Sequence, residues 1–297
     1  MNNVFNNSLE IKVWLKILIA ILLVVLGGFL FGSNFFLTLA AFIAASVANA
    51  TAIGGGFLFM PLFIFVYQLA PPIALKLSIA TQAFGMTSGA LTWGRSYIDR
   101  TAFLIASIAS IIGVWLATYS LAVPSAYIKP LFAIISLGVF FALVLEISLK
   151  VTDQQQKVNF RLNITSIFYA FVAFAGGLVT GWTAIGVGEM VALYLLFFYR
   201  LRLDKAIGTG VAVLAVSSIA GLIFHSDLGG IPLELLAYTV PGVILGGRYG
   251  VKVAKYIESN IKQSGSKKLF QKSPLKLIFA AVILIDCIVI LLSEFFS

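Results

Sequence analysis

The sequence predicts an all-α polytopic membrane protein with an inverted structural repeat, about seven crossings and two re-entrant, glycine-broken helical hairpins. Three observations support this fold class. Of the 297 residues, 61% are hydrophobic and only 10% are charged, a composition that is not compatible with a soluble domain of this length. Two long apolar runs are broken at equivalent places by glycine-containing stretches. Basic residues gather in the short loops, where they indicate the direction of each crossing.

The repeat becomes visible when the sequence is shifted along itself until Asn49 aligns with Gly181. Asn-Ala-Thr-Ala-Ile-Gly-Gly-Gly at 49–56 then aligns with Gly-Trp-Thr-Ala-Ile-Gly-Val-Gly at 181–188. The match continues beyond these breaks without a gap, for example from Gly89 to Gly221. We interpret the chain as a duplication.

Seven apolar runs are candidates for crossing helices, at 14–31, 73–93, 102–120, 131–149, 206–224, 235–247 and 277–292. The first run reaches spanning length and no small-residue cleavage site follows it, so we expect a retained helix and not a signal peptide. The glycine-broken runs, 35–68 and 164–199, are each about twice as long as a crossing requires. Each fits either one kinked crossing or a hairpin of two half-helices.

Loop charge favours hairpins. The connection 250–274 carries six lysines against one acid, and the positive-inside rule places it in the cytoplasm. One crossing earlier, 225–231 has no Lys or Arg and is expected outside. The connections 150–163 and 200–205 are both basic, so both ends of the second broken run are expected in the cytoplasm. A kinked crossing would put these two basic connections on opposite sides.

The first broken run has the opposite pattern. The segments 32–34 and 68–72 are uncharged, so both of its ends are expected outside. Lys12 and Lys16 place the N-terminus in the cytoplasm, and seven crossings then place the C-terminus outside. Each repeat has one helix, one hairpin and two helices, and this odd number of crossings inverts the second copy. In chain order the predicted units are the first repeat at 1–124, the second repeat at 125–250, a basic cytoplasmic connection at 251–274 and an extra C-terminal helix at 275–297.

The two glycine tips have the chemistry of an anion site. Irregular backbone at membrane depth must be covered by protein or line a wet cavity, and a helix N-terminus offers free N–H groups and a positive dipole end. Pro61 predicts a helix start near Phe59 or Met60. The N–H groups left free would be those of Gly55, Gly56, Phe57 and Leu58 in the first tip and those of Val187, Gly188 and Glu189 in the second. Close helix packing is the alternative reason for the glycines.

The candidate substrate-binding residues are therefore those around both tips: Asn49, Thr51, Gly54, Gly55, Gly56, Phe57, Thr183, Gly186, Val187, Gly188 and Glu189. Asn49, Thr51 and Thr183 offer hydrogen-bond donors to an anion. Their alternative role is to satisfy backbone groups that the break exposes.

Four residues are candidates for coupling or gating. Glu189 either stabilises the N-terminus of its helix or carries a coupling proton, since an ionised carboxylate repels an anion in the same tip. Lys76 either snorkels to the membrane interface or places a positive charge on the anion path. Gln82 lies on a polar helix face that either lines the path or makes interhelical contacts, and Trp182 is a candidate gate beside the second tip.

The motifs resemble those of the sulfite exporter TauE/SafE transporters of bacteria and archaea. Ala-Ile-Gly-Gly-Gly-Phe-Leu-Phe-Met-Pro at 52–61 is similar to that family's Gly-Ile-Gly-Gly-Gly-x-x-x-x-Pro, with Ala52 and its repeat partner Ala184 in place of the leading glycine. The segments 72–78, 205–210 and 218–221 are similar to further family elements. The resemblance implies export of sulfite, small organosulfonates or related anions, coupled to an ion gradient.

We therefore expect a secondary active transporter, not an enzyme, in the cytoplasmic membrane of a prokaryote, with a small sulfur-containing anion as substrate and H+ as coupling ion. A channel-like pore, a transporter of another small anion, or an intramembrane enzyme using Glu189 or Asp286 are the alternatives. One Cys and one His provide no disulfide, metal cluster or catalytic triad, so no metal or cofactor is expected. The net charge of +9 fits loop topology and lipid contact at Arg248, Lys252 and Lys255, and not nucleic-acid binding.

Overall fold

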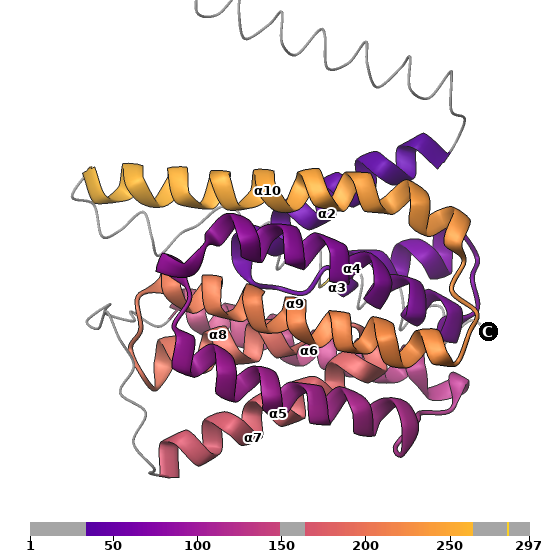
Figure 1. The fold of residues 1–297 in the computed structure, drawn as a ribbon, viewed down its shortest axis with the longest axis horizontal. Coiled ribbons are helices and arrows are strands. Elements are labelled where there is room, and N and C mark those ends of the chain that lie inside the picture. The colour runs from indigo at the N-terminus through magenta and orange to yellow at the C-terminus, as the bar shows by residue number, and fades with distance from the viewer. Residues whose placement is uncertain (1–33, 149–163, 264–283, 285–297) are drawn as a thin grey trace, which may run out of the picture.

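The computed structural model describes residues 34–148, 164–263 and 284, and the regular elements of this part of the chain are helical (Figure 1). In chain order they are α2 (Asn34–Thr51), α3 (Gly56–Pro61), the π-helical turn η1 (Leu62–Val66), α4 (Pro71–Trp93), the 3-10 turn η2 (Arg95–Tyr97), α5 (Arg100–Tyr119), α6 (Ser125–Ser148), α7 (Ile164–Thr183), α8 (Val187–Phe197), α9 (Leu203–Asp227) and α10 (Leu233–Gln263). The predicted crossing at 14–31, the connection 150–163 and Asp286 lie outside the described residues.

Three of the described helices, α5, α7 and α9, are long and apolar enough to cross a membrane. The prediction of an all-helical membrane protein is therefore confirmed. Local sequence accounts for where several helices begin. Two prolines start α4, where their missing N–H groups need no partner. Asp99 caps α5, because its carboxylate accepts a hydrogen bond from the Ala102 N–H at 3.1 Å.

The repeat in the sequence reappears in the backbone. Ala52 and Ala184, which align with each other in the repeat, both have positive φ, at 62° and 61°. Gln68 and Arg200 align in the same register, and both have φ of 51°. Non-glycine residues seldom adopt this left-handed conformation, and here it occurs at two pairs of positions that align in the sequence repeat.

The helices α4 and α9 lie against each other in the middle of the molecule and run in opposite directions. The Gln82 amide nitrogen donates to the Ser218 hydroxyl at 2.9 Å. Three residues earlier on α4, Ile79 lies against Gly221, which is three residues later on α9. The pairing runs forward along one helix and backward along the other, which defines an antiparallel pair.

Both of these helices have a parallel partner. The Thr81 and Thr239 hydroxyls are 3.0 Å apart, and further along both helices Ser88 donates to the Ile244 carbonyl, so α4 and α10 run together. On the other side the Ser110 and Ser217 hydroxyls are 2.8 Å apart, and further along both helices the Thr118 hydroxyl lies 3.4 Å from His225 Nε2, so α5 runs with α9. The partner helices α5 and α10 occupy equivalent places in the sequence repeat. Arg100, the first residue of α5, aligns with Pro232, the residue directly before α10.

Close backbone contacts add α2 and α7 to these two groups. Gly242, Gly246 and Gly250 of α10 lie in turn against the carbonyls of Thr38, Phe42 and Ser46 of α2, so these helices run in parallel. On α7, Gly177 lies against Ser110 of α5 and Gly181 against Ala117, again in parallel. Consequently α2, α4 and α10 share one direction, and their counterparts α7, α9 and α5 share the opposite one.

Each glycine-broken run folds back on itself. Gly176 lies against Val187, and the Ser166 and Tyr199 hydroxyls are 3.1 Å apart, so α8 returns antiparallel to α7. The first run also returns, because α4 starts in the same direction as α2. The arms are unequal, however. The first arms have 18 and 20 residues, and α8 has 11, which corrects the expectation of two half-helices. The backbone turns near the middle of each run, at Ala52 and Ala184, and the irregular residues that follow the turn shorten the second arm.

Basic residues gather at one end of the helical bundle, on the left of Figure 1. This end contains the α4–α5 connection, the start of α9 and the end of α10. Hydrogen bonds hold the three together: the Asp99 N–H donates to the Thr209 hydroxyl at 2.9 Å, and Lys255 Nζ donates to the Thr92 and Trp93 carbonyls at 2.9 and 3.1 Å. The basic residues here are Arg95, Arg100, Arg200, Arg202, Lys205, Lys252 and Lys255.

Candidate functional site

The two glycine tips touch each other at the centre of the fold. A side chain at Gly56 would collide with the carbonyl of Ala184, and a Cβ at Gly188 would lie 3.0 Å from the Ala52 oxygen. These contacts are reciprocal, because Gly188 and Ala184 are the repeat partners of Gly56 and Ala52. The structure therefore brings together the two stretches that the sequence predicted to meet, and glycine is needed for their close approach.

The start of α3 differs from the prediction. The helix begins at Gly56, three residues earlier than Pro61 indicated. The N–H groups of Leu58 and Phe59 both donate to the Gly55 carbonyl at 3.0 Å, and the Phe57 N–H donates to Gly54 at 3.4 Å. The expectation of four free N–H groups in this tip is wrong. Pro61 fits inside α3 because the helix ends there and continues as a π-helical turn, which accommodates the missing donor.

Gln82 of α4 links the first tip to α9. Its side-chain oxygen accepts a hydrogen bond from the Gly56 N–H at 3.1 Å, and its nitrogen donates to Ser218 at 2.9 Å. Because the backbone N–H requires an acceptor, the orientation of the amide follows from this pair of contacts. Gln82 is only 1% exposed. It lies beside the contact of the two tips and connects one half of the repeat to the other.

Thr180 closes the second tip. Its hydroxyl accepts a hydrogen bond from the Val187 N–H at 3.2 Å and donates to the Ile185 carbonyl at 3.0 Å. Gly186, with φ of 117°, makes the turn into α8. The expectation of a free Val187 N–H is therefore wrong. The next N–H group, that of Gly188, is in the first turn of α8, where a helix provides no acceptor of its own. Thr180 was not among the residues predicted for the site. Its position one turn before the break at Ala184 is the feature of the sequence that could have indicated its role.

Glu189 is the buried acid of the site. It lies in the first turn of α8, directly after the glycine that touches Ala52, and only 3% of its surface is exposed. A carboxylate in this place interacts favourably with the positive end of the helix dipole. Burial of an acid is costly, so such residues usually have a function in membrane proteins.

The polar residues before each break satisfy backbone groups. Asn49 is fully buried, donates to the carbonyls of Ala45 and Gly85 at 2.9 and 3.3 Å, and joins α2 to α4. The Thr51 hydroxyl donates to the carbonyl four residues earlier at 2.9 Å, as does that of Thr183 at 2.8 Å. These hydrogen bonds match the alternative role of these residues, which is to satisfy backbone groups near the break.

Lys76 and Trp182 lie away from the tip contact. Lys76 Nζ donates to the Gly229 carbonyl at 2.7 Å and to that of Leu228 at 3.4 Å, beyond the end of α9. The Trp182 indole N–H donates to the Leu121 carbonyl at 2.8 Å, after the end of α5. Their side chains therefore bind loops at the ends of helices.

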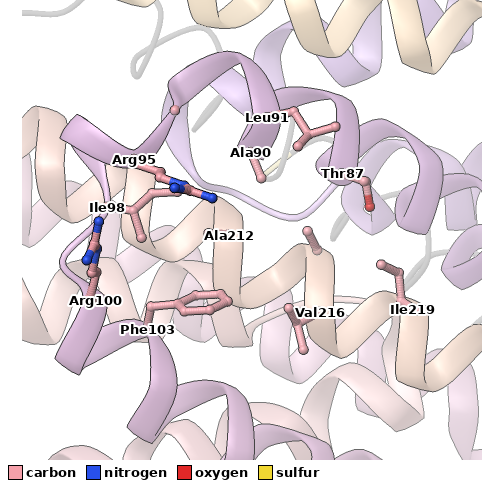
Figure 2. Close-up of a pocket in the computed structure, with 12 residues that line it drawn as sticks. Thr87, Ala90, Leu91, Arg95, Ile98, Arg100, Phe103, Ala212, Val216 and Ile219 are labelled. Carbon is pink, nitrogen blue, oxygen red and sulfur yellow. The ribbon is translucent and has the colours of Figure 1, made fainter.

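A separate cavity of about 670 Å³ lies between α4, η2, α5 and α9 (Figure 2). Its lining includes no residue of the two tips. The α4 residues in the lining are Thr87, Ala90, Leu91 and Gly94, whereas Gln82 faces the first tip through its contact with Gly56. The cavity is thus distinct from the tip site.

Comparison with known proteins identifies the family. The model of the sulfite exporter TauE/SafE family matches residues 37–290, which include both tips and all helices of the site. The chain belongs to this family. The resemblance of the glycine motifs is thereby confirmed, and the TauE/SafE assignment agrees with a multi-pass membrane protein. The probable membrane transporter protein YjnA of Bacillus subtilis (strain 168) is 23% identical over 261 residues, or 81% of this chain and 93% of the relative. No solved structure matches the chain.

Proposed function

We propose that this protein is a secondary active transporter that exports sulfite or an organosulfonate across the cytoplasmic membrane of a prokaryote, with anion movement coupled to protons. The TauE/SafE description and the printed name of the Bacillus relative support membrane transport of this kind. The observation that carries the proposal is the contact of two broken-helix tips at the centre of the fold. Such tips form the central binding sites of many secondary transporters.

The two halves are proposed to form an inverted repeat. Equivalent helices run in opposite directions, and positive-φ residues recur at equivalent positions, as expected for two copies related by a two-fold axis in the membrane plane. The proposed boundaries are 1–124 and 125–250, followed by a basic connection at 251–274 and a last helix at 275–297. With seven crossings and two hairpins, the basic end faces the cytoplasm, as does the N-terminus, and the C-terminus faces outward.

Backbone N–H groups at the two tips are proposed to bind the anion. In the first tip the Gly56 N–H holds the Gln82 oxygen, and an oxygen of the substrate is expected to replace it. In the second tip the Gly188 N–H lies in the first turn of α8, at the positive end of the helix dipole. No buried Lys or Arg is required. The remaining tip residues, from Asn49 to Phe57 and from Thr183 to Val187, position these groups.

Gln82 is proposed to couple binding to movement. When the anion accepts the Gly56 N–H, the Gln82 oxygen loses its hydrogen-bond donor, and the amide is no longer held in the orientation that binds Ser218 on α9. The first half of the repeat is then released from the second at this point. Alternating access in inverted-repeat transporters requires relative movement of this kind.

Glu189 is proposed to carry the coupling proton. It is buried in the same tip whose N–H groups face the anion. Ionised, it repels the substrate, and protonation removes that repulsion. An anion and a proton would therefore occupy the tip together and move in the same direction, so that the outward gradient of the anion drives its export and carries the proton with it.

Flux measurements in liposomes test the function. Purified full-length protein is reconstituted and assayed for uptake of labelled sulfite, methanesulfonate, sulfate and thiosulfate with and without a pH gradient. We expect accumulation of sulfite or the sulfonate against its gradient only when the pH gradient is present. Downhill flux alone would instead identify a channel-like pore. If none of the sulfur oxyanions moves, the proposed substrate class is wrong.

A further inference from the structure

The cavity between α4, η2, α5 and α9 combines two arginines with apolar walls. Figure 2 shows Arg95 and Arg100 at one end and Val216 and Ile219 toward the other. Arg95 begins η2, shortly after the end of α4, and Arg100 begins α5, so both lie in the connection between these two helices. In a multi-pass membrane protein this level corresponds to the interface between lipid headgroups and hydrocarbon.

Both guanidinium groups are available to an external anion. Within the described residues, neither side chain makes a hydrogen bond or an ion pair, and both are exposed. The acid nearest in sequence, Asp99, is engaged in capping α5 through the Ala102 N–H. Arginine binds phosphate oxygens through two parallel N–H groups, so this pair presents donors suited to a phosphate ester.

The rest of the cavity is apolar. Away from the arginines it is lined by side chains such as those of Leu91, Phe103 and Val216. The Thr87 hydroxyl is engaged by the Ala83 carbonyl at 2.6 Å, so the threonine adds no free polar group. Leu91 and Ile219 are 78% and 40% exposed, and the cavity is therefore open at its side. These walls offer no hydrogen bonds to a small hydrated anion, but they match a hydrocarbon chain.

We propose that this cavity binds an anionic phospholipid, with the phosphate on Arg95 and Arg100 and one acyl chain along the walls formed by α4 and α9. Charge complementarity selects the headgroup and the apolar lining selects the chain. The site is separate from the tips and does not depend on which anion is transported. Because it spans the antiparallel pair α4 and α9, a bound lipid contacts both halves of the repeat at once.

Lipid binding to the full-length protein in detergent tests the proposal. The probes are phosphatidylglycerol and phosphatidylcholine with identical acyl chains, and native mass spectrometry reports the bound fraction. We expect tighter binding of phosphatidylglycerol. The R95Q/R100Q variant should bind it about thirtyfold more weakly, since each basic residue near a membrane surface contributes roughly a fivefold effect. Equal binding of the two lipids by the wild type would overturn the proposal.

A matched control removes two exposed cations of α10. Arg248 and Lys252 are exposed on α10 and do not line the cavity. We expect R248Q/K252Q to retain the preference for phosphatidylglycerol. If this variant loses as much binding as R95Q/R100Q, the effect is a general attraction to negative charge and there is no site.

Two further measurements separate a lipid from a soluble ligand. Thr87→Phe fills the apolar part of the cavity without changing charge, and it should reduce phosphatidylglycerol binding while size-exclusion and circular dichroism profiles stay unchanged. Glycerol phosphate has the phosphate ester but no acyl chain, and it should compete only weakly. Full competition by glycerol phosphate, or undiminished lipid binding by Thr87→Phe, would show that the cavity is not a lipid site.

Discussion

At the scale of single residues, the site depends on how closely two turns of backbone approach each other. Gly56 contacts the Ala184 carbonyl, and its repeat partner Gly188 contacts that of Ala52. The two alanines have the left-handed conformation usually reserved for glycine, in keeping with the glycine that the family motif has there. Strain of this kind persists where surrounding structure imposes it, and it is concentrated at functional sites.

Gly56→Ala should destabilise the protein. The added methyl group meets backbone and not a movable side chain, so the two tips must separate. We expect a loss of about 1 to 3 kcal/mol, measured as a lower Tm in detergent. Gly138→Ala is the control, because a Cβ there meets no atom within 4 Å, and its Tm should be unchanged or slightly raised. An unchanged Tm for Gly56→Ala would contradict the observed contact.

Glu189→Gln tests the proposed proton site. Glutamine is neutral at every pH, so anion binding by the variant should no longer weaken as the pH rises. Accumulation driven by the pH gradient should be lost while downhill exchange remains. Methanesulfonate is the appropriate probe, because its own charge does not change near neutral pH. A variant that still accumulates the anion against its gradient would exclude Glu189 as the coupling group.

At the scale of elements, a lysine secures the C-terminal end of each helix of the central pair. Lys76 donates to carbonyls just beyond α9, and Lys255 donates to the last carbonyls of α4. A cation near the unsatisfied carbonyls at the end of a helix stabilises it. Lys255 also lies over the rings of Tyr97 and Trp93, at 4.4 and 5.4 Å from their centroids. Partial burial lowers the pKa of this amine.

Lys255→Met should weaken the junction of α4 and α10. The variant keeps most of the side-chain volume but removes the hydrogen bonds to Thr92 and Trp93 and the cation–π contacts. We expect a loss of about 1 kcal/mol, read from thermal unfolding. Lys252→Met, on the same helix but exposed, should have the Tm of the wild type. Equal Tm values for the two variants would show that the contacts of Lys255 do not contribute.

At the scale of the whole molecule, the central pair of helices and both outer pairs join the first half of the chain to the second. The central pair joins α4 to α9, and the outer pairs join α2 to α10 and α7 to α5. Each repeat therefore completes its packing with helices of the other. Basic residues gather at one end of the bundle, and the positive-inside rule predicts that this end of a membrane protein faces the cytoplasm.

Labelling of single cysteines tests this orientation. In a Cys287→Ser background, cysteine is introduced at Ser96, at the basic end, or at Ser226, near the end of α9; both serines are exposed. A membrane-impermeant maleimide should label Ser226→Cys in intact cells and Ser96→Cys only after the cells are opened. Labelling of both from outside would refute the proposed topology.

The fold class and the family could be predicted from the sequence, because composition, repeats and motifs can be read directly along the chain. Composition indicated the membrane, comparison of the sequence with itself revealed the repeat, and the glycine motifs indicated the TauE/SafE family. Only the tertiary structure showed that α3 begins at Gly56, that Gln82 and Thr180 hold the N–H groups of the tips, and that two arginines open into an apolar cavity. These features depend on contacts between distant segments, and no local pattern of residues specifies which acceptor a buried N–H group will find.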